Sequence, residues 1–236
     1  MNLFFDQSIN KNTKTVNFSF EESKHIKSFR MKSNELITVT NGKGLEWIGE
    51  LEIINKNNPI ANKISSKVHA GMISKIEIAI APTKKIDRIE WLLEKSTEIG
   101  VKKIHFIQTK NSIRKKINKE RLEKIIISSM KQSKQFHKPI IYDMISFNDF
   151  IILNNDTQKF IAHCQNTHKT DLAKNLINNN SCTIMIGPEG DFTRKEVDFA
   201  TLNGFNPVGL GKNRLRTETA ALVAIQTVHT LLAIKK

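Results

Sequence analysis

Two short loops near the C-terminus carry the residue types most suited to chemistry. The first runs from Gly187 to Asp191 and reads Gly-Pro-Glu-Gly-Asp, and the second runs from Leu210 to Thr219 and contains Arg216 and Glu218. Carboxylates in a glycine turn suit hydroxyls, an amine or a cationic ligand. An Arg close to a Glu could polarise or deprotonate a substrate. Together the loops indicate one ligand cleft.

Each loop also has a plainer interpretation. A glycine loop before a helix can hold phosphate, but Glu189 and Asp191 would repel it, and neither G-x-x-x-x-G-K-[ST] nor G-x-G-x-x-G occurs. In the second loop Thr217 or Thr219 could simply cap the last helix, with Glu218 favouring its macrodipole. Both interpretations stay open at this point.

The surrounding pattern places these loops at strand ends. An apolar run, 183–186, leads into the first loop, and Thr193 followed by Glu196 is a capping box that starts a helix. From Lys75 onward, strand-like and helix-like segments alternate, which predicts an α/β fold with a parallel sheet and helices on both faces. Ligands in such folds bind at the carboxyl ends of the strands.

The first part of the chain has a different texture. Ser19 begins a capping box for a short helix, and strand-like runs at 36–40 and 45–53 flank Asn41-Gly42, a strong hairpin signal. We therefore predict a small, mostly β domain at 1–71 and a second domain at 72–236.

Composition limits the class of partner. The chain has 37 Lys and Arg against 23 Asp and Glu, a formal net charge of +14, which favours a polyanion such as nucleic acid. Alternatively, the high lysine content could reflect only general amino-acid usage and have no connection with a binding partner. No apolar run approaches the roughly 20 residues that span a bilayer, and the N-terminus does not resemble a secretory signal. We expect a cytoplasmic protein without a membrane partner.

Metal chemistry has little support. Cys164 and Cys182 are the two cysteines, and His163 beside Cys164 gives half a metal site without further ligands at usable spacing. We expect no metal.

The two loops together resemble those of a known family. Ile186 to Thr193 with Glu196, then Gly209 to Gly211 with Leu215 to Ala220, are similar to the RsmE family of SPOUT methyltransferases. Other segments agree with this resemblance. Arg88, Glu94-Lys95 and 97–101 resemble its first methyltransferase motif, and Gln132-Ser133 followed by Pro139 resembles its second. His25 and Phe29 to Met31 resemble its RNA-binding, PUA-like β-barrel domain.

The resemblance implies both fold and activity. It implies a C-terminal SPOUT α/β trefoil-knot domain after a PUA-like β-barrel, a homodimer, and S-adenosylmethionine-dependent methylation of uridine N3 in 16S (small-subunit) rRNA. The implied catalytic residues are Arg216 and Glu218. The implied cofactor-binding residues are His163, Ile186, Gly187, Pro188, Glu189, Gly190, Gly209, Leu210, Gly211, Leu215, Arg216, Thr217 and Ala220. The implied RNA-binding residues are Arg30, Lys32, Arg88, Lys95 and Arg114.

The sequence departs from the family at several positions. The family usually has Gly where this chain has Asp191, and Arg where this chain has Lys134. Two other functions remain possible: a SPOUT enzyme that methylates tRNA, and a non-catalytic RNA-binding protein that uses only its positive charge.

Overall fold

A computed structural model of the chain describes residues 2–54, 58–71, 75–177 and 181–234. Its contacts divide the chain into two compact units, Met1–Met72 with Ile127–Lys138, and Ile73–Ile126 with Pro139–Lys236. The segment Ile127–Lys138 thus packs with the first unit although it lies beyond residue 71 in the chain. The domain boundary after residue 71 stays a prediction.

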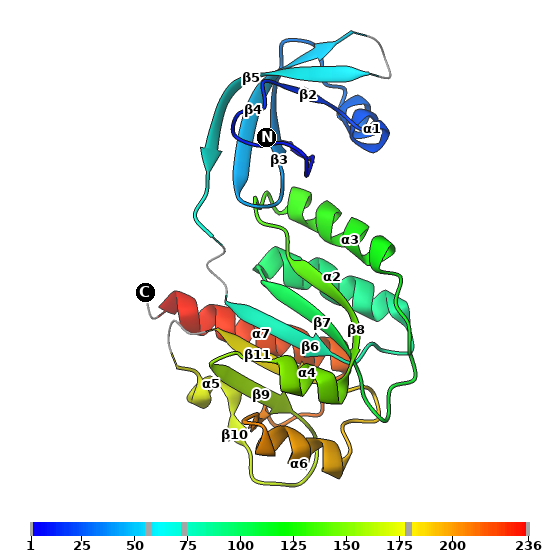
Figure 1. The fold of residues 1–236 in the computed structure, drawn as a ribbon, viewed down its shortest axis with the longest axis vertical. Coiled ribbons are helices and arrows are strands. Elements are labelled where there is room, and N and C mark those ends of the chain that lie inside the picture. The colour runs from blue at the N-terminus through cyan, green and yellow to red at the C-terminus, as the bar shows by residue number, and fades with distance from the viewer. Residues whose placement is uncertain (1, 55–57, 72–74, 178–180, 235–236) are drawn as a thin grey trace. The chain divides into compact units, whose positions relative to one another are not determined.

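The first unit is built on a five-stranded mixed sheet. Its strands, in spatial order, are β1 (Leu3–Phe5), β3 (Leu36–Thr40), β4 (Leu45–Ile53), β5 (Pro59–Val68) and β2 (Thr15–Asn17). β1 pairs parallel to β3, and the other pairings are antiparallel. The sheet is curled (Figure 1), and its core contains the fully buried Trp47, Phe4 and Leu51. This is the architecture expected for a PUA-like domain.

Local sequence signals explain the first unit well. The predicted hairpin is confirmed, because β3 and β4 have the predicted bounds and Gly42 in their turn has a φ of +71°. Helix α1 (Phe20–Ser28) is capped by Ser19, whose hydroxyl accepts a hydrogen bond from the Glu22 N–H at 3.2 Å.

The second unit is built on a seven-stranded sheet whose described pairings are all parallel (Figure 1). Its spatial order is β10 (Thr170–Asp171), β12 (Asn206–Gly209), β9 (Gln158–Ala162), β11 (Cys182–Ile186), β6 (Ile76–Ile80), β7 (Lys103–Gln108) and β8 (Ile140–Ser146). The stretch from β9 to the last helix is the part for which the resemblance implies a knot.

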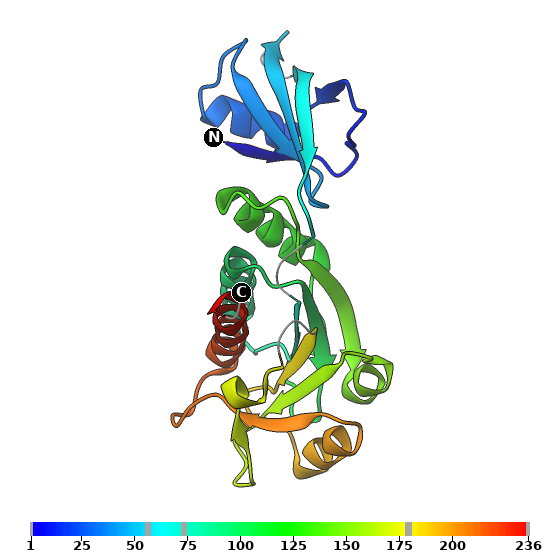
Figure 2. The same cartoon turned by 90° about the vertical axis from the view of Figure 1, so that its left-hand side faces the viewer.

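Helices cover both faces of this sheet (Figure 2). α2 (Ile86–Ile99), α5 (Leu172–Asn175) and α7 (Thr217–Ile234) lie on one face, and α4 (Phe147–Leu153) and α6 (Arg194–Leu202) lie on the other. Adjacent side chains of a strand point to opposite faces of its sheet, and in β6 Ile78 packs against the first set of helices and Ala79 against the second. The predicted fold class is confirmed.

Two details differ from the prediction of local sequence signals, which is that Asp87 caps a helix and that the helix starting at Asn118 is ended by Pro139. Asp87 does not cap α2: the N-cap is Lys85, without a side-chain hydrogen bond, and Asp87 lies in the first turn. Helix α3 (Lys119–Gln132) ends well before Pro139, because Lys134 takes a left-handed conformation with φ +55° and the Gln135 N–H bonds back to the Met130 carbonyl.

The last helix is more apolar than the composition analysis anticipated. By length and composition alone α7 could cross a bilayer, contrary to the expectation that no run comes close. Its residues Ala221, Ala224, Ile225 and Val228 are buried in the core of the second unit. A core helix passes the same test, so α7 is weak evidence for a membrane span.

Candidate functional site

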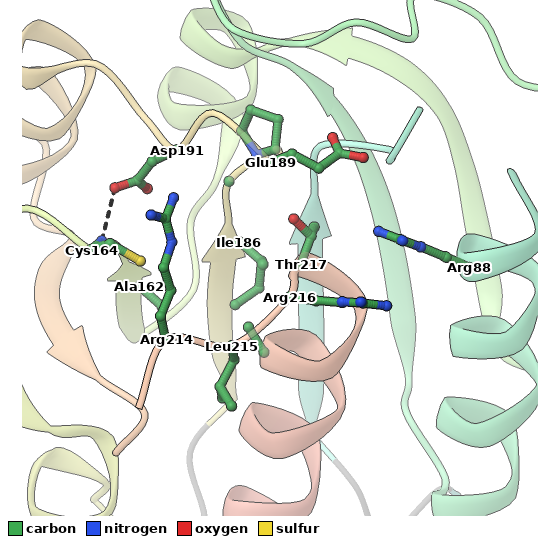
Figure 3. Close-up of a pocket in the computed structure, with 13 residues that line it drawn as sticks. Arg88, Ala162, Cys164, Ile186, Glu189, Asp191, Arg214, Leu215, Arg216 and Thr217 are labelled. Atoms are coloured by element: carbon green, nitrogen blue, oxygen red, sulfur yellow. Dashed lines mark hydrogen bonds between the residues drawn. The ribbon is translucent and has the colours of Figure 1, made fainter. Parts of the chain in front are cut away.

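A two-lobed cleft lies where the carboxyl ends of β9, β11 and β12 meet the loop before α7, and Figure 3 shows the residues of its first lobe. The first lobe, of about 290 Å³, is lined by Arg88, Ala162, Cys164, Ile186, Gly187, Pro188, Glu189, Asp191, Arg214, Leu215, Arg216, Thr217 and Ala220. The second lobe, of about 350 Å³, is lined by Ala162, His163, Cys164, Lys169, Val208, Gly209, Leu210, Gly211, Lys212, Asn213, Arg214, Leu215 and Ala220. The shared residues make the lobes parts of one site.

Hydrogen bonds hold the Gly187–Asp191 loop from outside the cleft. Glu189 Oε1 accepts the Lys84 N–H at 2.9 Å, which ties the loop to the segment after β6. Asn111 donates its side-chain N–H to the carbonyls of Gly190 and Asp191, at 3.1 and 2.9 Å. Polar bonds to backbone groups give the cleft a preformed wall.

Asp191 joins this loop to the end of β9. Its φ of +60° is left-handed, a region that glycine adopts without cost and in which Asp is one of the better tolerated alternatives. Its Oδ2 accepts the Cys164 N–H at 2.8 Å, the bond drawn in Figure 3. Arg214 extends toward the same carboxylate from the opposite wall (Figure 3). The non-glycine residue therefore contributes a carboxylate to the cleft.

Arg216 directly precedes α7 and Glu218 lies in its first turn, and the two side chains have different surroundings. Arg216 is exposed and lines the first lobe, and its carbonyl accepts the Ala220 N–H at 2.7 Å. Glu218 is only 7% exposed, and its Oε1 lies 3.6 Å from Arg88 Nε. Its buried Oε2 has no hydrogen-bond partner within the part of the chain that the structure describes. The buried carboxylate thus relies on Arg88 for compensation.

His163 brings an uncommitted imidazole to the second lobe. It is 7% exposed, and neither ring nitrogen has a hydrogen-bond partner among residues 2–54, 58–71, 75–177 and 181–234. Burial lowers the pKa of His163, and the nearby Lys169 ammonium lowers it further. A neutral imidazole has one donor and one acceptor nitrogen, so it can bind a ligand in either sense.

The structure brings most of the predicted cofactor-binding residues together. Ile186, Gly187, Pro188, Glu189, Arg216 and Thr217 line the first lobe, His163, Gly209, Leu210 and Gly211 line the second, and Leu215 and Ala220 line both. Gly190 lines neither lobe. It lies against Asn111, since a Cβ built at this position would come within 3.3 Å of the Asn111 Cβ. Glu218 also lies behind the lobes rather than in their lining.

The predicted RNA-binding residues fall into two groups. In the second unit, Arg114 donates to the carbonyls of Thr83 and Lys84, at 3.1 and 2.7 Å. Hydrogen bonds from Lys95 to two glutamates of its own helix raise the pKa of Lys95. In the first unit, Arg30 and Lys32 are exposed just after α1. Arg88, as shown above, lines the cleft and pairs with Glu218.

Sequence reasoning missed three residues that line both lobes: Ala162, Cys164 and Arg214. A signal for the first two existed, because β9 ends beside β11 and adjacent parallel strands open onto the same edge. Across the described ranges, no three His, Cys, Asp or Glu side chains are grouped to hold a metal ion.

This fold and this cleft define an RNA methyltransferase. Residues 72–229 match the family described as RNA methyltransferase domain, and residues 21–64 match the RNA methyltransferase PUA domain. The chain is 28% identical over 232 residues to the ribosomal RNA small subunit methyltransferase E of Rickettsia conorii, covering 97% of this chain and 95% of that protein.

Solved structures agree over the whole length. A probable rRNA-methyltransferase from Porphyromonas gingivalis superposes with a TM-score of 0.93 at 35% identity, covering 100% of both chains. A ribosomal RNA small subunit methyltransferase E from Neisseria gonorrhoeae, bound to S-adenosyl methionine, gives 0.88 at 27% identity and covers 98% of both. The chain belongs to the ribosomal RNA small subunit methyltransferase E family, the RsmE family that the two loops indicated.

Proposed function

We propose that this protein transfers a methyl group from S-adenosylmethionine to N3 of a uridine in small-subunit rRNA. The two-lobed cleft carries this proposal, because both sequence loops contribute to its lining. The names of the relatives support rRNA of the small subunit as the substrate and S-adenosylmethionine as the cofactor. The choice of uridine N3 comes from the sequence resemblance.

The residues of the cleft suit this cofactor. Ile186, Leu215 and Ala162 offer apolar surface for an adenine ring. Glu189 and Asp191 line the first lobe as carboxylates, which suit the positive charges of a sulfonium and an amino group. The ring nitrogens of His163, which lack a hydrogen-bond partner among the described residues, suit a hydroxyl or a ring nitrogen of a nucleoside in the second lobe.

The chain's own residues would have two tasks in the reaction. The bound cofactor supplies an activated methyl group, so the protein has to align the acceptor and manage one proton. Uridine N3 is a poor nucleophile until its proton leaves. Arg216, exposed in the first lobe, is positioned to stabilise the negative charge of the uracil. Glu218, paired with Arg88 at 3.6 Å, would orient Arg88 at the cleft, and it would accept the proton only if its side chain turned into the lining.

Assembly and location are also part of the proposal. By resemblance to its family, we propose a homodimer that works in the cytoplasm. Sedimentation equilibrium of the purified full chain tests the dimer directly, and a mass equal to one chain at all concentrations would contradict it.

The test of the activity is methylation of purified rRNA. The protein is incubated with unmodified small-subunit rRNA, or with small subunits, and S-adenosylmethionine, and the nucleosides are then analysed by mass spectrometry. The proposal expects N3-methyluridine at one site, and an Arg216→Ala variant that retains cofactor binding but loses turnover. A methylated base other than uridine, or methylation of tRNA alone, would contradict the proposed substrate.

A further inference from the structure

A third cavity lies in the first unit, remote in sequence from the two loops of the cleft. It measures about 270 Å³ and is lined by Asn2, Leu3, Phe4, His25, Phe29, Ser128, Lys131, Gln132 and Lys134. All of these residues belong to the unit formed by Met1–Met72 and Ile127–Lys138. The cavity thus lies between two sequence motifs that have no role in the proposed chemistry, Phe29 to Met31 and Gln132-Ser133.

We propose that this cavity binds one unpaired nucleotide of the RNA substrate, with the base stacked on Phe29. This inference rests on the proposed function, and it adds a second RNA-recognition site outside the methyl-transfer cleft. Its elements are an aromatic platform, polar groups for a base edge, and a cation for the phosphate.

Phe29 is the platform. The residue is 54% exposed, a large apolar surface for a residue at the end of a short helix. The ring is held from one side by the fully buried Phe4, with centroids 6.2 Å apart at 88°. Phe29 is thus anchored by one aromatic contact and otherwise open to solvent, and an exposed, anchored aromatic ring is what a nucleic-acid base stacks on, whatever its sequence.

His25 lines the cavity and can donate a hydrogen bond. Its Nδ1 lies 3.0 Å from Lys131 Nζ, and Lys131 also bonds Glu22 Oε1 at 2.5 Å. An ammonium group can only donate, so His25 Nδ1 accepts and the proton of the neutral ring lies on Nε2. The exposed Gln132 amide adds a donor and an acceptor. This set can bond a base edge without demanding a particular base.

Lys134 supplies the cation, at a position where glycine would be the easier residue. It follows α3 with φ +55°, donates its N–H to the Lys131 carbonyl, and completes the turn that ends the helix. Arg30, beside Phe29, does the same after α1 with φ +54° and an N–H bond to the Lys27 carbonyl. Such left-handed helix ends favour glycine, so two exposed cations there suggest a use for the side chains. The competing explanation is that both cations merely offset the helix dipoles.

The test measures binding of a short fluorescent single-stranded RNA, and of the same sequence as a duplex, to the full chain. We expect Phe29→Ala to weaken single-strand binding about tenfold, in line with the loss of one stacked base, and to affect the duplex little. The matched control is Phe20→Ala, since Phe20 is the first residue of the helix that Phe29 follows, is 68% exposed and does not line the cavity. Equal losses in the two variants, or none in Phe29→Ala, would overturn the proposal.

Glycine variants separate RNA binding from folding. Lys134→Gly relieves a left-handed backbone and should keep or raise the melting temperature while weakening single-strand binding and its salt dependence. Asn34→Gly is the control, because Asn34 is exposed with φ +70° and lies outside the cavity lining. If Lys134→Gly changes the melting temperature but not RNA affinity, the cation serves only the helix end and the proposal fails.

The same variants distinguish this proposal from the proposed function. With rRNA as substrate, Phe29→Ala should raise KM for RNA and leave kcat and S-adenosylmethionine affinity unchanged. A wild-type protein that binds RNA through Phe29 but methylates nothing would refute the methyltransferase function and leave the nucleotide cavity standing.

Discussion

The pair of Arg88 and Glu218 permits a quantitative test of the site. Two unit charges 3.6 Å apart attract by about 4–5 kcal/mol at an effective dielectric constant of about 20. Desolvation of the carboxylate offsets much of this, and Arg88 is 31% exposed, which weakens the pair further. We therefore expect a net coupling of about 1–2 kcal/mol.

A double-mutant cycle isolates that coupling. Unfolding free energies in urea are compared for the wild type, Arg88→Met, Glu218→Gln and the double variant. Arg88→Met should cost about 1–2 kcal/mol more in the wild-type background than in the Glu218→Gln background, because only the former leaves a buried carboxylate uncompensated. A coupling below about 0.3 kcal/mol would refute this account of the pair.

The cycle, combined with the salt dependence of RNA binding, distinguishes two roles for Arg88. The sequence predicted an RNA contact, whereas the structure pairs Arg88 with Glu218 and places it in the cleft lining. A phosphate contact would reduce the salt slope of RNA binding by about one when Arg88 is lost. An unchanged slope together with strong coupling would assign Arg88 to the pair alone.

Three further predictions concern single residues. Cys164 is exposed and lines both lobes, so it should react with iodoacetamide and be protected by S-adenosylmethionine. Burial raises the pKa of the Cys182 thiol to about 12, so Cys182 should react only when the chain is unfolded. Mass spectrometry of the labelled peptides checks both expectations. Burial lowers the pKa of His163, so the unfolded chain binds the proton of this residue more readily than the folded chain does. The folded state is therefore destabilised as pH falls through the usual histidine pKa of about 6.5. His163→Gln should reduce the change in urea midpoint between about pH 8 and about pH 5.5, and an unaltered pH dependence would argue against this account. Thr193→Ala removes the capping box of α6 and should cost about 1 kcal/mol in urea unfolding, whereas no loss would mean that the cap is redundant.

Local signals explain which parts of the fold the sequence could predict. The Asn41-Gly42 hairpin and the Thr193 capping box depend on neighbouring residues only, and the structure has both where predicted. The cleft also followed from the sequence, because glycine and acidic residues after apolar runs mark loops at the carboxyl ends of parallel strands.

Long-range placement could not be predicted in the same way. The period of α3 shows that one face is apolar, but it does not show that Ile127–Lys138 packs with the first unit. Likewise β12 follows β11 in the chain yet lies on the far side of β9, which no strand pattern reveals. The same limit applies to the site. From its position in the sequence Glu218 was expected to line the cleft, whereas its side chain pairs with Arg88.

The central claim is that the two-lobed cleft binds S-adenosylmethionine. Ala220, on α7, lines both lobes, so Ala220→Phe should fill the cleft, whereas Gln226→Phe places the same ring on an exposed position of the same helix. Calorimetric titration of the full chain, with and without rRNA, should show one cofactor per chain in the wild type and in Gln226→Phe, and no binding in Ala220→Phe. Unchanged binding by a folded Ala220→Phe variant, or no binding by the wild type even with rRNA present, would contradict the account.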